Sequence, residues 1–431
     1  MWVERFAAAA AVCSLAVNAN SAFAQGTTDT DAGVVVAPAK TPDEPPVPRG
    51  LFPEPRLMTR GLAEAAKRID KQGPKRDGFY FRFGTGITGA GWIAAGPGYR
   101  HRLPGSPFTF DASGAISWRA YKIVQIKTVG SWLEDRVNAG VQAVWEDRTQ
   151  ADYFGTGTSS APGQRTGYRL RGSDYTAFAG FGSLSKWRVD ARVGALVNPR
   201  ISPAGGWREP KHPDTVALLN EAGAPALTAS PDFRHAEVAI TSNRLNYTAH
   251  PTRGGLVQMA AGTYRDQTLH RYSFNRYEVA LLRMVPVVPD LWTLALHGAL
   301  IASTTSGNNG VPFYLLPTLG ANNALRGYPS HRFADRNLAV VNLESRWAVL
   351  AHMDGVFFVD AGEVAPSMDS FARRSLKTSY GVGARIHTGK TTVVRIDVAR
   401  SAEGWQLMFR TNEPLLLSVL KRGVGIAPMQ P

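Results

Sequence analysis

Residues 135–147 read DRVNAGVQAVWED, and apolar side chains recur in them at every second position. In an extended strand, Val141 and Trp145 therefore share one face, while Gln142 and Glu146 share the other. The same period of two continues through most of the chain that follows. It indicates an all-β protein, because a helix would repeat its apolar positions every three to four residues.

The polar face of these strands is charged. In WRVDARVG, residues 187–194, the valines alternate with Arg188, Asp190 and Arg192. A soluble sandwich also alternates, but its polar face looks at bulk water. Outer-membrane barrels place the apolar face on lipid and the charges in a polar lumen. We therefore expect a transmembrane β-barrel.

Segment counting predicts sixteen antiparallel strands, at residues 78–88, 92–103, 107–118, 120–131, 134–147, 166–181, 186–199, 233–246, 254–267, 273–287, 291–304, 335–349, 353–363, 377–388, 391–400 and 404–412. The long connections all follow odd-numbered strands, at 148–165, 200–232, 305–334 and 364–376. Bacterial barrels have short periplasmic turns and long external loops. This sorting predicts that the N-terminus lies in the periplasm.

The first residues predict export. Ala7 to Val17 form an apolar core, and Ala22-Phe23-Ala24 has the small-x-small pattern of a cleavage site, so residues 1–24 are interpreted as a signal peptide. The apolar run is too short for an anchor, which needs about 20 residues. Cys13 is the single cysteine, so the mature chain is expected to form neither a disulfide nor a thiolate metal site.

Two flanking segments are expected outside the barrel, which is assigned to residues 78–413. Residues 25–77 are Pro-rich at first and are predicted to be a disordered periplasmic leader with one short helix near Leu62 to Lys71. That helix either lies against the membrane or barrel mouth, or is a solvated linker. Residues 414–431 form a C-terminal tail for which the sequence suggests no role.

The formal net charge of +14 restricts the partners. Such a charge can indicate nucleic-acid binding, but an exported chain rarely meets nucleic acid, and Lys and Arg are spread along this sequence. Anionic outer-membrane lipids and lipopolysaccharide are the expected counter-charges.

Three strings in the last third of the chain carry a family resemblance. Leu325-Arg326-Gly327-Tyr328 lies in the sixth predicted external loop, VNLESRW follows at 341–347, and GVFFVDAG at 355–362. Together they resemble the BamA/TamA (bacterial surface antigen) family of outer-membrane insertases, as do DYFGTG at 152–157 and HPTRGG at 250–255. The resemblance covers roughly residues 78–412 and implies a barrel with a loop folded into its lumen.

The residues themselves support such a loop. Glu344 and Arg346 are two apart and face the same lumen, as do Phe358 and Asp360 on the next strand. If the loop folds inward, Arg326 can fork onto Asp360 with Glu344 nearby. The alternative is that Arg326 is an exposed loop arginine without a partner. The predicted lumen lock consists of Arg326, Gly327, Tyr328, Glu344, Arg346, Phe358, Asp360 and Gly362.

The first strand is rich in glycine, with Gly84, Gly86, Gly89 and Gly91 close together. Glycine weakens a strand. If this strand pairs with residues 404–412, the seam is a place where the barrel could open; the alternative is that these glycines serve a tight turn and close packing.

The resemblance implies a role in outer-membrane protein or lipid assembly or translocation. The leader is too short and Pro-rich for the periplasmic POTRA domains that capture clients in the family, so we expect a periplasmic or outer-membrane protein partner to replace them. A passive diffusion pore and a barrel-embedded lipid-modifying enzyme are the alternatives. No GxSxG, HExxH, Walker or paired-cysteine pattern occurs and the 9 histidines are scattered, so no catalytic residue, metal site or cofactor is expected.

Overall fold

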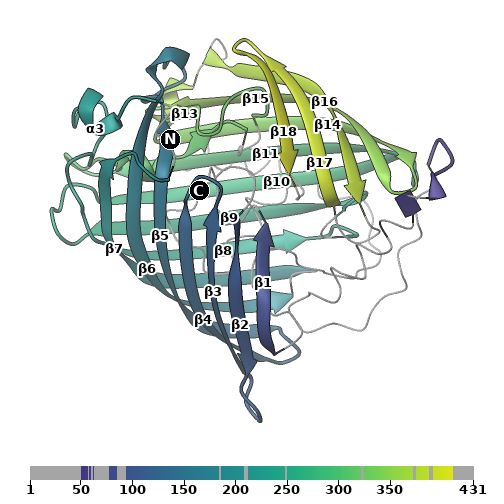
Figure 1. Ribbon diagram of the computed structural model, residues 1–431, viewed down its shortest axis with the longest axis horizontal. Helices are drawn as coiled ribbons and strands as arrows, with labels where there is room; N and C mark the ends of the chain where they lie inside the picture. Colours follow the sequence, from purple (N-terminus) through teal and green to yellow (C-terminus); the bar gives the residue numbers. More distant parts are fainter. Residues whose placement is uncertain are drawn as a thin grey trace.

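A computed structural model describes residues 50–56, 58–59, 62, 77–84, 94–183, 186–207, 212–247, 250–321, 325–371, 375–387 and 392–410. The predicted signal peptide, the predicted leader helix apart from Leu62, and the tail 414–431 lie outside these residues. The described chain is dominated by one 16-stranded antiparallel sheet that curves into a barrel (Figure 1). The predicted fold class is confirmed.

The sheet contains β1 (Gly78–Gly84), β2 (Ala94–Arg102), β3 (Phe108–Ser117), β4 (Lys122–Trp132), β5 (Val137–Tyr153), β6 (Thr166–Ser183), β7 (Trp187–Pro203), β8 (Phe233–Asn243), β9 (Gly254–Asp266), β10 (Phe274–Val288), β11 (Trp292–Thr305), β14 (Asn337–Leu350), β15 (Met353–Ala365), β16 (Lys377–His387), β17 (Thr392–Ser401) and β18 (Gly404–Arg410). Each strand pairs antiparallel with the next one in this order. β1 and β18 are the two ends of the sheet, and no ladder joins them within the described residues.

The β5–β6 hairpin is longer than the sequence predicted, and an ion pair lies across its extended part. β5 continues to Tyr153 and β6 begins at Thr166, so the predicted loop 148–165 was wrong in its first six residues. The pairing of β5 with β6 shifts register between Arg148 and Ala151. The alternation of apolar and polar residues is interrupted there, so the sequence pattern did not predict the longer strand. Arg169 forms a forked pair with Asp147 across this hairpin, at 2.7 and 2.6 Å.

β7 likewise runs to Pro203, beyond the predicted end at 199. After the sixth external loop, β14 begins at Asn337, two residues later than predicted. Between β11 and β14, residues 306–336 contain two short strands, β12 (Thr318–Leu319) and β13 (Phe333–Ala334), which pair with each other. We call residues 306–336 loop 6.

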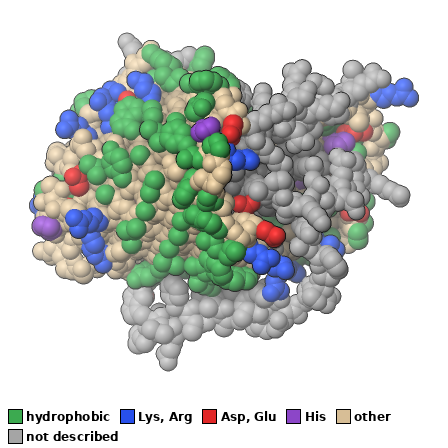
Figure 2. Space-filling model, turned by 90° about the horizontal axis from the view of Figure 1, so that it is seen from below, with side chains coloured by type: hydrophobic (Ala, Val, Ile, Leu, Met, Phe, Trp, Pro, Cys, Tyr) green, Lys and Arg blue, Asp and Glu red, His purple; other side chains and the backbone are tan. Residues whose placement is uncertain are grey.

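The outward faces of the strands are apolar. Phe79, Phe81, Val141 and Val193 are all exposed, whereas Tyr80 points inward and donates to Asp111. Figure 2 shows hydrophobic side chains gathered over the strand surface. This is the alternation that the sequence predicted, and it suits contact with lipid.

Aromatic pairs mark the end of the barrel that carries the short turns. The pairs are Phe108 with Trp132, Phe181 with Trp187, and Trp292 with Trp347. Aromatic girdles sit at the membrane interfaces of outer-membrane barrels. The turns themselves are tight; in the β2–β3 turn, Gly105 has a φ of +68°, a conformation that glycine adopts without strain.

The opposite end carries the long loops, which pack on one another. Their largest apolar cluster combines Tyr153 and Tyr168 of the β5–β6 hairpin, Leu227 of the β7–β8 loop and Phe313 of loop 6. The short helix α3 (Thr215–Leu218) belongs to the same β7–β8 loop. No helix in the described part of the chain is long and apolar enough to cross a bilayer.

Candidate functional site in the barrel lumen

Loop 6 folds back against the inner wall of the barrel. Leu319, Leu325 and Phe333 of the loop are buried in one apolar cluster with Leu338 of β14 and Val364 of β15. The strand wall supplies these partners because every second residue of β14 and β15 points inward. The loop is therefore held in the lumen by ordinary apolar packing before any charge is considered.

Arg326 lies at the tip of this packed segment. Its Nε and Nη2 donate to the two oxygens of Asp360 at 2.8 and 2.5 Å, and its backbone N–H donates to Asp360 Oδ2 at 3.0 Å. Its Nη1 donates to Glu344. Arg326 is 1% exposed and both carboxylates are 0% exposed. The structure thus brings together the three charged residues at the centre of the predicted lumen lock.

Asp360 and Glu344 have further partners on the wall. Asn342 Nδ2 donates to Asp360 Oδ1 at 2.8 Å. Arg346 Nε donates to Glu344 Oε2 at 2.8 Å, and Arg385 Nη2 lies 3.5 Å from Glu344 Oε1. Buried charges are stable only when they are paired and hydrogen-bonded, and these contacts fulfil that condition for both carboxylates.

An aromatic ring supports the Arg326 guanidinium from one side. Arg326 Cζ lies 3.5 Å from the centroid of the Phe358 ring, a cation–π geometry. Gly381 of β16 makes room for that ring, because a Cβ there would lie 2.6 Å from Phe358 Cζ. Arg326 is therefore fixed by two carboxylates and one aromatic face.

The two residues after Arg326 complete the contact with the wall. A Cβ on Gly327 would lie 2.5 Å from Ser379 Cβ and 2.8 Å from Ser401 Cβ, so only glycine allows this close approach. Ser401 Oγ donates to Gly327 O at 2.6 Å. Tyr328 is buried against Phe333, with ring centroids 5.2 Å apart.

Gly362, the last of the predicted lock residues, lies against the other side of the loop. A Cβ there would be 3.0 Å from Leu319 Cδ1. Seven of the eight predicted residues therefore lie at the interface between loop 6 and the β14–β17 wall, and Arg346 pairs with Glu344 on that wall.

A second arginine of loop 6, Arg332, was missed in the sequence. It is 1% exposed. Its Nε lies 2.9 Å from both oxygens of Glu403 in the β17–β18 turn, its Nη1 donates to Ser160 Oγ at 2.9 Å, and its Nη2 donates to Ser160 O at 2.5 Å. The guanidinium also lies over the rings of Phe154 and Phe333.

The DYFGTG string lies at this second anchor. Besides the Phe154 ring, it provides Thr156, which forms a parallel bridge with Ala334 of loop 6, and Gly157, whose N–H donates to Ala334 O at 2.8 Å. Arg332 and its neighbours thus join the β5–β6 loop, loop 6 and the β17–β18 turn. RGY at 326–328 and DYFGTG at 152–157 were the only sequence motifs near this contact, and neither contains Arg332.

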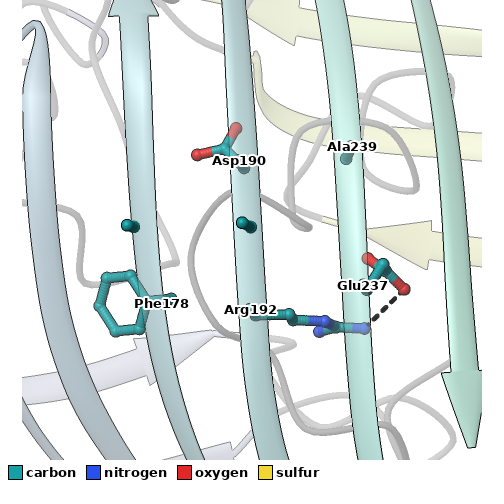
Figure 3. A pocket seen from close by; sticks show the side chains of 7 residues that line it. Phe178, Asp190, Arg192, Glu237 and Ala239 are labelled. Atoms are coloured by element: carbon teal, nitrogen blue, oxygen red, sulfur yellow. Dashed lines mark hydrogen bonds and ion pairs between the residues drawn. The ribbon is translucent and has the colours of Figure 1, made fainter.

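A different part of the wall, on β6–β8, also carries charge. Figure 3 shows Arg192 of β7 extended toward Glu237 of β8, with Asp190, Phe178 and Ala239 around a small cavity. Arg192 Nη2 donates to Glu237 Oε2 at 2.9 Å, and Arg188 Nε donates to Asp190 Oδ1 at 2.7 Å. The alternating charges of 187–194 therefore face the lumen.

The predicted glycine seam is described only in part. Gly84 ends β1, where it pairs with Ala94 of β2. Gly86, Gly89 and Gly91 lie outside the described residues.

Three histidines of the strands and loops contact oxygen atoms of neighbouring residues. His235 Nε2 lies 2.8 Å from Asp174 Oδ2, and His297 Nδ1 lies 2.8 Å from Asn342 Oδ1. His270 lies in the β9–β10 loop with Nδ1 3.1 Å from Asp266 O. No serine hydroxyl among the described residues forms a hydrogen bond with any of the three.

Comparison with known proteins agrees with this architecture. The model of the Omp85 superfamily domain matches residues 128–404. The chain belongs to the Omp85 superfamily. Barrels of this family are outer-membrane proteins, and its members act as insertases or transporters. The comparison with curated proteins gives no match.

Three solved structures are similar at low sequence identity, and the first of them, with a TM-score of 0.51, shows the fold. BamA from Haemophilus ducreyi lacking POTRA domains 1–3 is similar with a TM-score of 0.51 and 13% identity, over 82% of this chain and 78% of that chain. CdiB from Acinetobacter baumannii gives 0.45 and 9%, over 77% and 58%. CdiB from Escherichia coli gives 0.46 and 13%, over 77% and 61%. The resemblance to the BamA/TamA family that the sequence motifs carried is confirmed at this level.

Proposed function

We propose that this Omp85 barrel acts in outer-membrane protein or lipid assembly or translocation. The observation that supports the proposal most is the burial of Arg326 between Asp360 and Glu344. Family membership and this anchor together favour a device that moves clients past or along its wall.

The position of the lock relative to the sheet edge suggests how it contributes. Gly327 O accepts from Ser401 of β17, and β17 is the strand beside β18 at the edge of the sheet. A strand edge presents unpaired N–H and C=O groups that can pair with an incoming strand. We infer that the anchored loop keeps β17 in shape while the edges of β1 and β18 exchange partners.

The proposal includes an orientation of the barrel in the outer membrane and a set of partners. The short turns would face the periplasm, with residues 1–24 as a cleaved signal peptide and 25–77 as a periplasmic leader. The net charge of +14 suits anionic lipid head groups and lipopolysaccharide. A periplasmic or outer-membrane protein partner would deliver clients, and affinity purification from outer membranes tests this part.

The experiment that tests the function uses the purified chain in lipid vesicles. An unfolded outer-membrane barrel protein is added, and its folding is followed by protection from protease. Vesicles with the wild-type chain should speed client folding several-fold over empty vesicles, and Arg326→Ala should lower that gain. Equal folding rates with and without the wild-type chain contradict insertion of protein clients.

A diffusion pore is the second candidate, because the β6–β8 wall places charged side chains in the lumen. Single-channel recording separates the two functions. A large steady conductance of the wild-type chain would favour the pore. Brief, infrequent openings that become longer in Arg326→Ala would favour the locked barrel.

A further inference from the structure

A group of cations lies on the outer face of the barrel, where β4 to β9 approach the long loops. These strands are consecutive neighbours in the sheet (Figure 1). The side chains point outward, because the residues next to them along the strands, such as Leu170, Phe233 and Tyr264, are buried in the apolar cluster under the loops. We call the following six residues the rim cations: Lys122, Arg169, Arg171, Arg200, Arg234 and Arg265.

Four of the rim cations face one another in pairs across the sheet. Arg171 of β6 is the direct cross-strand partner of Arg200 of β7, and Arg234 of β8 is that of Arg265 of β9. Side chains directly opposite in an antiparallel pair have Cβ atoms about 4.5–5.5 Å apart, and like charges at these positions destabilise the sheet. The outer face therefore holds two repulsive pairs at the same end of adjoining strands.

A single carboxylate serves half of the rim cations. Asp147 of β5 accepts a fork from Arg169 at 2.7 and 2.6 Å, and it lies 3.6 Å from Arg171 Nε. It is also the cross-strand partner of Lys122 in β4. Its side chain is 2% exposed, whereas that of Arg171 is 48% exposed. The carboxylate is thus covered by cations that still present their charge outward.

The other three rim cations have no anionic partner in the part of the chain that the structure describes. Arg265 donates to Asn275 Oδ1 at 3.0 Å, which is a neutral acceptor. Arg200 and Arg234 are exposed and form no ion pair among the described residues. The outer face of β6 to β9 therefore carries an excess of positive charge that the described residues do not balance.

The same strands are apolar between the rim cations and the short turns. Tyr175 of β6, Val193 of β7, Val238 of β8 and Met259 of β9 are exposed on the outer face, and Trp145 of β5 is partly exposed two residues before Asp147. In outer-membrane barrels the lipid-facing band is apolar and aromatic residues border it at the head groups. The rim cations therefore lie where the strands leave the apolar band, at the level of lipid head groups.

We propose that the rim cations bind the phosphate groups of lipopolysaccharide in the outer leaflet. The proposal deepens the partners named under the proposed function and rests on the orientation given there, with the long loops outside the cell. Arginine binds phosphate through paired N–H groups, and lysine binds it as a point charge. A phosphate between two opposed arginines replaces their repulsion by attraction to a shared anion. The apolar band below them suits the acyl chains of the same lipid.

The place of this site in the sheet separates it from the proposed exchange of strands. β2 and β3 lie between β4 and the edge strand β1, and β10 to β17 lie between β9 and the edge strand β18. A lipid held by the rim cations would steady the wall that does not open. Lipid binding is measured without a client, so failure of client assembly and failure of this proposal give different results.

The affinity of the purified full chain for lipopolysaccharide of defined structure tests the proposal. The lipid is titrated in detergent against the wild type and against a variant that combines Arg200→Gln with Arg234→Gln. These two side chains form no ion pair within the described residues, so the variant should fold, which heat-dependent migration on a gel checks. Its affinity should fall roughly thirtyfold, because each cation near an anionic lipid surface contributes about a factor of five.

A variant with Arg136→Gln and Arg253→Gln is the matched control. It loses the same charge from exposed residues of the β4–β5 and β8–β9 turns, at the opposite end of the barrel. It should bind lipopolysaccharide as the wild type does. For the wild type, lipopolysaccharide with its phosphates removed should bind at least tenfold more weakly than the intact lipid, and phosphatidylglycerol should also bind more weakly.

Heat stability gives a second measurement. Without lipid, the variant at Arg200 and Arg234 should unfold at the temperature of the wild type or above it, since like-charge repulsion is relieved. With lipopolysaccharide the wild type should gain more stability than this variant, because a ligand that binds the folded state stabilises it. Equal lipopolysaccharide affinity in the two double variants, equal binding of the intact and dephosphorylated lipids, or equal binding of phosphatidylglycerol would overturn the proposal.

Discussion

Two parts of the lumen wall carry buried ion pairs, yet only one of them holds a loop. On β6–β8, Arg192 pairs with Glu237 of the adjacent strand, which is next to it in any case. On β14–β17, Arg326 comes from loop 6 and reaches Glu344 and Asp360 from outside the sheet. The Arg192–Glu237 pair joins two strands that the sheet already holds together. The contacts of Arg326 instead attach loop 6 to the wall, to which no sheet hydrogen bonds join Arg326.

The ion pair that holds loop 6 is also more deeply buried than the pair on β6–β8. The side chains of Arg192 and Glu237 are 9% and 6% exposed, and a cavity borders them. The side chains of Arg326 and Asp360 are 1% and 0% exposed. A charge that water can reach tolerates the loss of its partner, while a fully enclosed charge does not. The comparison therefore predicts a ranking of mutational effects.

The largest effect is expected for Arg326→Ala. It leaves the enclosed Asp360 without its cation, while Glu344 keeps Arg346, and it should lower the free energy of unfolding by about 3–5 kcal/mol. Unfolding temperature, read from heat-dependent migration on gels, measures the loss. Asp360→Ala should have an effect of similar size, and the double variant should cost less than the sum because both changes break one contact. Strictly additive losses would show that the contact carries no coupling energy.

Arg332→Ala should come next, with a loss of about 2–3 kcal/mol. It frees Glu403, whose side chain is 17% exposed and so is partly hydrated after the loss. The same gel assay measures it. Because Arg332 holds the β5–β6 loop through Ser160, protease cleavage in residues 154–165 should also increase. An unchanged cleavage pattern would separate Arg332 from the ordering of that loop.

Gly327→Ala tests the close approach of loop 6 to β16 and β17. The added Cβ would meet Ser379 and Ser401 at 2.5 and 2.8 Å, so the loop has to move outward. A loss of about 2 kcal/mol in the free energy of unfolding is expected from overpacking. Gly205→Ala is the control, because its Cβ would meet nothing within 4 Å. Equal losses for both variants would show that the close approach of Gly327 to Ser379 and Ser401 adds nothing to the cost of the change.

The sequence was sufficient for the strands and for the centre of the lock. Alternation fixed which face of each strand turned inward, so Glu344 and Asp360 could be placed in the lumen without coordinates. The sixth loop could be recognised because its RGY string and the FVDAG string occur together. Both inferences depend on short-range patterns that a single sequence contains.

Contacts between distant loops could not be predicted in this way. Arg332 reaches Ser160 across 172 positions and Glu403 across 71, and nothing in the periodicity of either segment points to the other. Tertiary packing, and not local pattern, decides these contacts.

The smallest effect is expected for Arg192→Ala, which removes a pair of the same chemistry from the β6–β8 wall. Glu237 keeps contact with the cavity beside it, where water can replace the guanidinium. The free energy of unfolding should fall by about 1 kcal/mol, and the conductance of the barrel should shift toward cations because a fixed positive charge is lost. Reversal potentials in a salt gradient measure that shift. If Arg192→Ala destabilised the barrel as much as Arg326→Ala, the difference in burial between the two ion pairs would not determine their contribution to stability. The attachment of loop 6 to the wall would then depend on its apolar packing.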